Sequence, residues 1–237
     1  MAFNHGSNIY KDPVFAVNAV GENSSSIATS WRDLSDNPHD AAKYGDATYG
    51  VCTGSLDAGI PYVEFAESYS SYLDLGTSLV MDEEPFATNG MTIQYYVYLN
   101  ALNDNSMFGQ NASANTGAWF YGDGRPGFFI NGGSNLVIAA ASNDGGTVTS
   151  HKWMYIANVY DKPGGKLYVY MNGVKANEAN CTADIAYSNV SSKICRLEGV
   201  TSYSGNCRIG QYEIYSRALS ATEIAEFFEN TRGRYKI

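Results

Sequence analysis

The sequence predicts an all-β protein, an antiparallel sandwich of the jelly-roll type that ends in one short helix. Apolar and polar residues alternate along short runs through most of the chain, which is the pattern of half-buried strands. Charged residues make up only 16% of the chain, whereas tyrosines number 19 and glycines 24, a composition that favours strands and turns. No helical pattern separates the runs before the C-terminus, so alternating strands and helices are not expected.

The clearest strands lie in the middle of the chain. Residues 91–99 alternate without interruption, and residues 152–160 do the same. The Asn172-Gly173 pair is a strong hairpin signal, so 152 to about 178 is predicted to be a three-stranded antiparallel meander. Further strands are expected at 14–19, 61–66, 72–75, 106–110, 117–122, 127–131, 136–141, 165–173, 194–198 and 206–215.

A helix is predicted at the end of the chain because a capping box and a hydrophobic staple stand there together. Its apolar residues are spaced to share one face, and Gly233 is expected to end it. A helix this short is not stable alone, so we expect it to lie on a sheet and plug one end of the sandwich. The residues of this structural cap are Leu219, Ser220, Glu223, Ile224, Phe227 and Phe228.

Composition and charge exclude several classes of function. The net charge is −9 and no basic cluster is visible, so a nucleic-acid partner is not expected. No apolar stretch reaches membrane-spanning length, and the N-terminus lacks the pattern of a signal peptide, so we expect neither membrane insertion nor export. Free thiols are therefore expected at Cys52, Cys181, Cys195 and Cys207, with a disulfide between Cys195 and Cys207 left open.

The search for catalytic residues points away from an enzyme. A glycan hydrolase needs two carboxylates at a defined separation, and no strand carries such a pair. The three histidines are isolated in the sequence and suggest no catalytic triad. We therefore predict no catalytic residues.

One segment could bind a glycan. AWFYGDGRPG combines aromatic side chains with polar ones, the combination that a sugar site needs, and its candidate residues are Trp119, Tyr121, Asp123 and Arg125. The alternative, which we favour, is that Trp119 belongs to the core and that DGRPG is only a turn.

Several segments, in order, resemble those of laminin-G-like, concanavalin A-like jelly-roll domains. They are SWRDLSDN at 30–37, YVEFAESYSSYLDLG at 62–76, PFATNGMTIQYYVYL at 85–99, HKWMYIANVYDKPGGKLYVYMNG at 151–173 and IGQYEIYSRALSATEIAEFFENTRGRY at 209–235. The resemblance implies one domain over 13–237, preceded by an N-terminal arm at 1–12. It also implies that Trp31 and Trp153 are framework residues of the core.

Many domains of this family hold calcium on rim loops, through the oxygen ligands that this cation prefers. The candidates here are Asp104, Asn105, Asp123 and Asp144, and each also fits ordinary turn chemistry. Acidic positions of the family are Ala66 and Ser71 in this chain. We therefore expect no metal and no cofactor.

The entry DPVFAVNAVGEN and the exit FFENTRGRY are similar to the versions found in proteins of tailed bacteriophages. This resemblance implies a non-enzymatic virion protein, a capsid decoration, fibre or tail component, assembled in the host cytoplasm. Its expected partners are other virion proteins, further copies of itself and glycans to which it attaches. The alternatives are a soluble carbohydrate-binding lectin and, more weakly, a glycan-degrading hydrolase.

Overall fold

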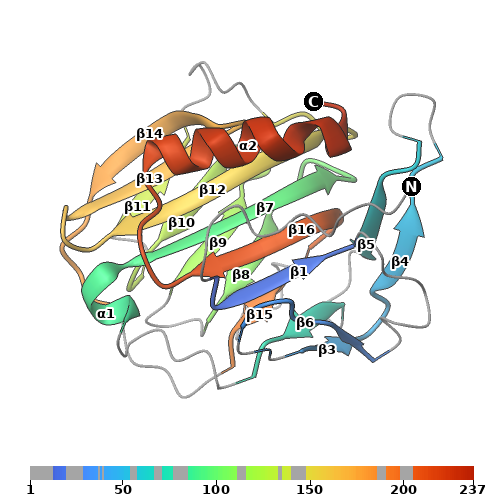
Figure 1. The fold of residues 1–237 in the computed structure, drawn as a ribbon, viewed down its shortest axis with the longest axis horizontal. Helices are drawn as coiled ribbons and strands as arrows, with labels where there is room; N and C mark the ends of the chain where they lie inside the picture. The colour runs from blue at the N-terminus through green and yellow to red at the C-terminus, as the bar shows by residue number, and fades with distance from the viewer. Residues whose placement is uncertain are drawn as a thin grey trace.

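The computed structural model shows two antiparallel sheets packed face to face, with a helix lying on the outside of one of them (Figure 1). The predicted all-β sandwich is confirmed. The structure describes residues 13–19, 29–36, 38, 40–53, 58–66, 71–76, 85–110, 116–132, 135–139, 148–185, 191–197 and 205–237. The proposed N-terminal arm, 1–12, lies outside these residues.

The sheet beneath the helix, called sheet A, has the strand order β14-β13-β12-β7-β16-β5-β4, and β1 pairs with β16. The meander is confirmed: Met171 pairs with Val174 across a two-residue turn, where Asn172 and Gly173 both have positive φ angles of 48° and 79°. The strands of sheet A are β1 Phe15–Asn18, β4 Thr48–Val51, β5 Pro61–Phe65, β7 Met91–Leu99, β12 Trp153–Asp161, β13 Lys166–Met171, β14 Val174–Asn180 and β16 Cys207–Tyr215.

The facing sheet, sheet B, has the order β11-β10-β9-β8-β15-β6-β3-β2. Its strands are β2 Ser30–Trp31, β3 Ala41–Tyr44, β6 Tyr72–Asp74, β8 Asn105–Gly109, β9 Gly117–Phe120, β10 Pro126–Phe129, β11 Leu136–Ile138 and β15 Lys193–Ile194. Strands β2, β3 and β4 were not predicted, because their short sequences carry no apolar alternation. A single helical turn, α1 (Phe86–Asn89), also precedes β7, contrary to the expectation of no helix before the C-terminus.

The main core fills the space between the sheets. It takes inward residues from both sheets, and Trp31 is fully buried in it, as expected. The neighbouring Asp33 is also buried and fixes this segment to β1, because its Oδ1 accepts hydrogen bonds from the backbone N–H groups of Ala16 and Ser35, each at 2.9 Å. Asp33 therefore connects β1 of sheet A to the segment that follows Trp31.

The C-terminal helix α2 spans Ala221–Tyr235 and begins as predicted. Ser220 Oγ accepts a hydrogen bond from Glu223 N at 3.3 Å, and Glu223 Oε2 accepts one from Ser220 N at 2.8 Å. The predicted end at Gly233 is wrong: the helix continues to Tyr235, and Lys236 adopts the left-handed capping conformation with φ of 56°. The helix continues because Tyr235 is buried and stacks on Tyr96, with ring centroids 3.7 Å apart.

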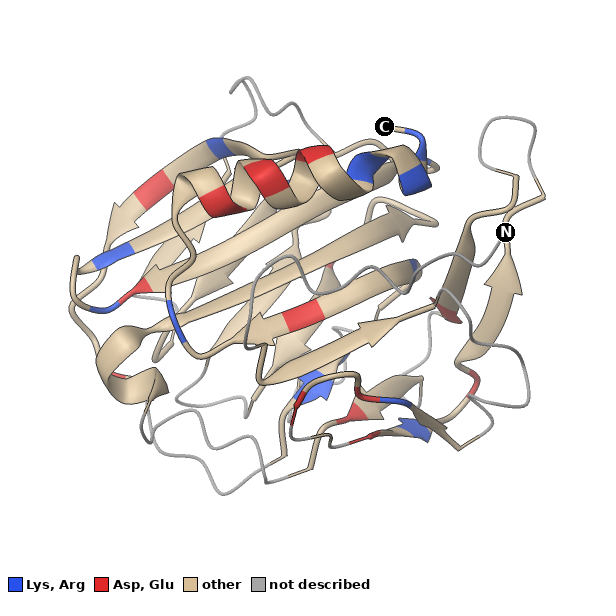
Figure 2. Cartoon of the chain, viewed as in Figure 1, with Lys and Arg blue, Asp and Glu red and all other residues tan. Residues whose placement is uncertain are grey.

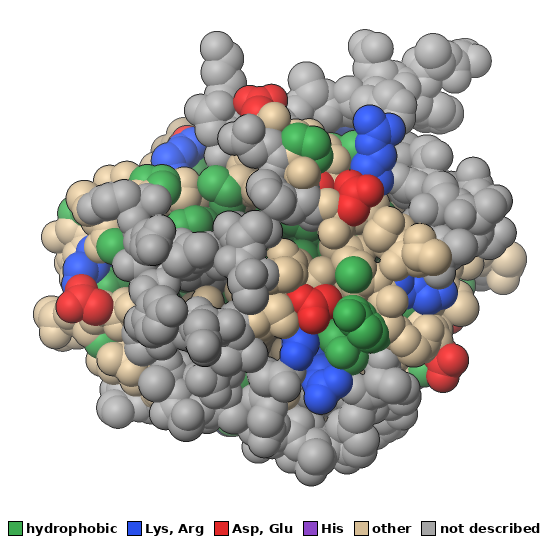
Figure 3. Space-filling model, turned by 90° about the horizontal axis from the view of Figure 1, so that it is seen from below, with side chains coloured by type: hydrophobic (Ala, Val, Ile, Leu, Met, Phe, Trp, Pro, Cys, Tyr) green, Lys and Arg blue, Asp and Glu red, His purple; other side chains and the backbone are tan. Residues whose placement is uncertain are grey.

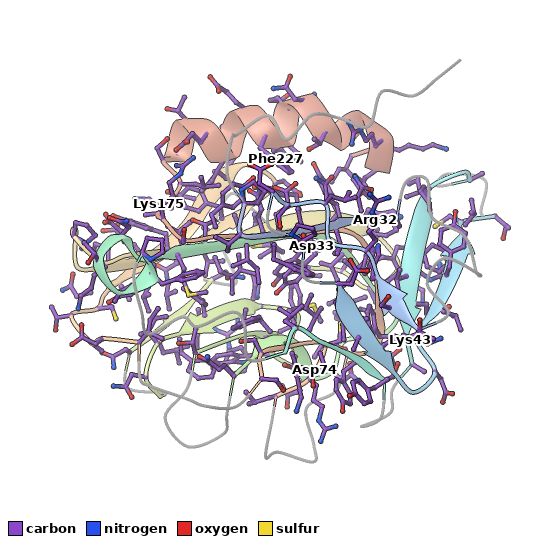
Figure 4. All side chains as sticks on the ribbon, turned by 60° about the horizontal axis from the view of Figure 1, so that its bottom comes forward. Arg32, Asp33, Lys43, Asp74, Lys175 and Phe227 are labelled. Atoms are coloured by element: carbon purple, nitrogen blue, oxygen red, sulfur yellow. The ribbon has the colours of Figure 1, made fainter. Side chains whose placement is uncertain are left out.

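The position of α2 also corrects the sequence prediction. The helix does not plug an end of the sandwich but lies across the outer face of sheet A (Figures 1 and 4). The outward residues of β7, β12 and β16 include the large aromatic side chains Tyr96, Tyr155 and Tyr215, and α2 covers them. Phe227 and Phe228 stack on Tyr155 at 5.5 and 5.8 Å between centroids.

These contacts form a second hydrophobic layer under α2, which we call the helix layer. Every residue of the predicted cap that faces the sheet is buried in it, namely Leu219, Ile224, Phe227 and Phe228. Trp153 is buried as expected, but in the helix layer instead of between the sheets. The charges of the helix run from acidic at its start to basic at its end (Figure 2), which suits the helix dipole.

Candidate functional site

The β9–β10 hairpin carries the aromatic residues of the predicted site. Ala118 and Phe120 point into the main core, so Trp119 between them faces outward from sheet B. Trp119 is half-buried and lies outside the core, so the interpretation of it as a core residue is not met.

Three outward rings meet on this hairpin, and we call them the aromatic platform: Trp119, Tyr121 and Phe129. The Trp119 ring lies 4.7 Å from that of Phe129 and 5.2 Å from that of Tyr121, between centroids. Two glycines make room for the rings. A Cβ atom on Gly127 would lie 3.3 Å from Trp119, and one on Gly117 would lie 2.3 Å from Phe129. Glycine at these positions lets the rings lie against the backbone.

Polar groups border the platform at the hairpin turn. Arg125 Nε donates to Asp123 Oδ2 at 2.7 Å, and its guanidinium lies 5.7 Å from the centroid of the Tyr121 ring. Desolvation raises the pKa of Asp123, but hydrogen bonds from the Arg125 backbone and side chain outweigh it and hold the pKa below its usual value. Asp123 is exposed and Arg125 half-buried. The structure thus brings all four predicted site residues together.

Phe129 completes the platform and was missed from the sequence. Phe120 pairs with Pro126 across the hairpin, and Gly117 pairs with Phe129. The signal was available, because two strands joined by the DGRPG turn and paired in this register place Phe129 on the same face as Trp119.

Sheet B carries a second outward aromatic pair, on its other half. Tyr44 and Tyr72 stack at 4.7 Å between centroids, and the guanidinium of Arg196 lies 4.6 Å from the Tyr72 ring. Asp74, which is on β6 with Tyr72, lies in the sheet farther from α2 (Figure 4). Seen from below, the described surface shows hydrophobic side chains beside basic and acidic ones (Figure 3).

The described candidate calcium ligands form hydrogen bonds with other residues of this chain. Asn105 is buried, and its Oδ1 accepts a hydrogen bond from Asn206 N at 2.6 Å. Asp104 Oδ1 accepts one from Gly122 N at 2.9 Å, and both oxygens of Asp123 bind Arg125. Asp144 lies outside the described residues. The expectation of no metal stays a prediction.

One carboxylate is fully buried on a strand. Glu213, beside Tyr215 of the helix layer, accepts hydrogen bonds from Gln94, Gln211 and Tyr215 at 2.7, 2.6 and 2.6 Å. Burial raises its pKa and outweighs these three hydrogen bonds. A glycosidase needs a second carboxylate across the bond to be cleaved, and the described partners of Glu213 are amides and a phenol.

The thiols of Cys195 and Cys207 are both buried, and their Sγ atoms lie 3.7 Å apart. The residues that the structure describes include no helix long and apolar enough to cross a membrane.

Comparison with solved structures shows the same fold. The binding domain of Paraclostridial Mosquitocidal Protein 1 matches with a TM-score of 0.71 and 15% identity, over 95% of this chain and 55% of that one. The binding domain of botulinum neurotoxin serotype G matches with a TM-score of 0.66 and 16% identity, over 93% and 51%. This chain therefore spans about half the length of those binding domains.

A third match has nearly the same extent as this chain. Domain 4 of AbnA, an extracellular arabinanase of glycoside hydrolase family 43 from Geobacillus stearothermophilus, was solved in complex with arabinotriose. It has a TM-score of 0.62 and 16% identity, over 91% of this chain and 97% of that domain. A search of curated proteins found no match to the sequence.

The sequence itself matches one family profile, described as the concanavalin A-like lectin/glucanases superfamily, over residues 69–225. The match covers more than half of the chain and includes β7, β12, β13 and the start of α2. Together with the two-sheet sandwich, it establishes that this chain belongs to the concanavalin A-like lectin/glucanase superfamily.

Proposed function

We propose that this protein is a non-enzymatic glycan-binding protein and that the aromatic platform of sheet B is its binding surface. The observation that carries the proposal is the half-buried, outward-facing Trp119, set between Tyr121 and Phe129 on two glycines, with Arg125 and Asp123 at its edge. A sugar would place its apolar C–H face on the rings and its hydroxyl groups on the ion pair. The fold shared with a domain solved with arabinotriose supports the proposal by analogy.

A glycan array tests this proposal. The wild-type protein should bind a subset of glycans, and Trp119→Ala should abolish binding to those members of the subset that the platform holds. Tyr168→Ala is the matched control, because Tyr168 is a half-buried aromatic residue on β13 of the other sheet. Thermal unfolding of each variant shows whether it is folded. A glycan-array profile that Trp119→Ala leaves unchanged for every glycan would refute the platform as a binding surface.

For the biological setting, we propose a virion protein of a tailed bacteriophage: a capsid decoration, fibre or tail component that works in several copies and attaches the particle to glycans. The support is the resemblance of FFENTRGRY at the C-terminus, whose Tyr235 is buried against Tyr96. Mass spectrometry of purified particles should find the protein at high copy number. A protein that binds glycans but is absent from particles would instead be a soluble lectin.

A further inference from the structure

A second group of aromatic and polar side chains lies on the opposite outer face of the sandwich. Glu64, Arg208, Tyr98 and Trp153 stand side by side on β5, β16, β7 and β12, because Arg208 pairs with both Glu64 and Tyr98, and Tyr98 pairs with Trp153. Their strand neighbours point into the main core, so this row faces outward from sheet A. We call it the cross-strand row.

Arg208 is held rigidly at the centre of the row. Its guanidinium lies 4.5 Å from the Tyr62 ring centroid and 4.9 Å from that of Tyr98. Its Nε binds Glu64 Oε1 at 3.0 Å, and Asn100 Nδ2 donates to the same oxygen at 3.1 Å. The side chains of Arg208 and Glu64 remain 25% and 32% exposed, so this ordered pair is still open to a ligand.

Several polar groups of the row have no partner among the described residues. Glu64 Oε2 and the two terminal nitrogens of Arg208 make no hydrogen bond there. Trp153 Nε1 is buried and has no partner either. Beside Tyr98, His151 holds a left-handed backbone conformation with φ of 64°, which is rare for a residue with a side chain and frequent at functional sites.

We propose that the cross-strand row is a second binding site, for an uncharged sugar with adjacent hydroxyl groups. Each hydroxyl both donates and accepts a hydrogen bond, so a pair of them complements guanidinium N–H donors next to a carboxylate acceptor. Glu64 neutralises Arg208 and repels an anion, so the row disfavours acidic sugars. With the aromatic platform on the other outer face, the molecule would hold glycans on two sides.

The experiment uses the full chain with Trp119→Ala, which removes the platform and leaves the row intact. An array of neutral and acidic glycans identifies ligands, and isothermal titration with the best neutral glycan gives the affinity. Arg208→Lys keeps the charge but loses the planar donors, and Glu64→Gln keeps the shape but loses the carboxylate. Each should weaken binding about tenfold when added to Trp119→Ala. Glu229→Gln, which disrupts an exposed ion pair on α2, is the control and should change nothing.

The outcomes separate this proposal from that for the platform. Neutral-glycan binding that survives Trp119→Ala and falls with Arg208→Lys and Glu64→Gln supports the row. If Arg208→Lys unfolds the protein, the nearly isosteric Glu64→Gln decides. The proposal is overturned if Trp119→Ala alone leaves no neutral-glycan binding, or if Glu64→Gln binds as tightly as its parent. Wild-type binding that resists Trp119→Ala but fails in Glu64→Gln would refute the platform and support the row.

Discussion

Both sheets carry aromatic residues on the outward face of their strands. The two outer faces differ in what covers these residues. On sheet A, Tyr96, Tyr155 and Tyr215 are fully buried, because α2 and its cap cover them. On sheet B, Trp119 remains half-buried and Tyr44 is 46% exposed. An aromatic residue on the second face of a strand is therefore structural where another layer covers it. It is available to a ligand where that layer is missing.

The sharpest test of this difference is to truncate one aromatic residue on each face. Phe227→Ala in the helix layer should lower the free energy of unfolding by about 3–5 kcal/mol, because it leaves a cavity against Tyr155. Trp119→Ala removes a larger side chain from the open face and should cost less. Urea denaturation measures both, with the exposed Asn230→Ala of α2 as a near-neutral control. Equal costs for Phe227 and Trp119 would remove the distinction between the faces.

The second prediction concerns the hydrogen bonds that fix α2 to sheet A. Thr231 Oγ1 donates to Phe227 O at 2.6 Å, so Tyr96 OH donates to Thr231 Oγ1, also at 2.6 Å. Thr231→Val leaves the buried Tyr96 hydroxyl without an acceptor and should cost about 1–3 kcal/mol. Tyr96→Phe leaves Thr231 still bonded and should cost about 0.5–1.5 kcal/mol. Denaturation of both variants checks the order, and a larger cost for Tyr96→Phe would contradict it.

Burial in the helix layer should also give the protein a pH dependence. Because the pKa of Glu213 is raised in the fold, the folded protein holds this proton more tightly than the unfolded chain does. The resulting stabilisation is complete below the unfolded pKa and is lost as pH rises through the folded pKa. Denaturation from acid to neutral pH should show this loss in the wild type and not in Glu213→Gln. The exposed Glu229→Gln should follow the wild type, and parallel curves for Glu213→Gln and wild type would rule the effect out.

The smallest expected effect is a stabilisation. Gly233 lies inside α2 without a positive φ angle, and a Cβ atom there would meet nothing within 4 Å. Gly233→Ala should therefore raise the free energy of unfolding by about 0.5–1 kcal/mol through helix propensity. Thermal unfolding measures the shift. A destabilised variant would mean that the helix ends at Gly233 after all.

The sequence predicted those parts of the fold whose signals are local. Alternation placed β7 and β12, the Asn172-Gly173 turn placed the β13–β14 hairpin, and the capping box placed the start of α2. Strands β3 and β4 were not predicted, because their own residues show no apolar alternation and pairing with neighbouring strands holds them in the sheets. The end of α2 was predicted wrongly. The contact between Tyr235 and Tyr96 joins distant parts of the chain and keeps the helix intact past Gly233.

The sequence predicted which residues form the candidate site but not how deeply Trp119 is buried. Trp119, Tyr121, Asp123 and Arg125 are close in sequence, and the hairpin brings them together. Whether Trp119 faces the core or solvent depends on the register with Gly127, which composition does not give. The cross-strand row could not be predicted from the sequence, because Glu64 and Arg208 are 144 positions apart and are brought together by the pairing of β5 with β16.

The place of β16 has a consequence for synthesis. This strand pairs with β1, β5 and β7, which precede it in the sequence and are made much earlier. During synthesis, the strands that pair with β16 keep unpaired edges until residue 215 has emerged from the ribosome. The aromatic outer face of sheet A stays uncovered until α2 has also been made. A chain that stops before β16 would therefore lose the strand that joins both halves of the sheet. Sheet A can therefore be completed only after β16 has been made.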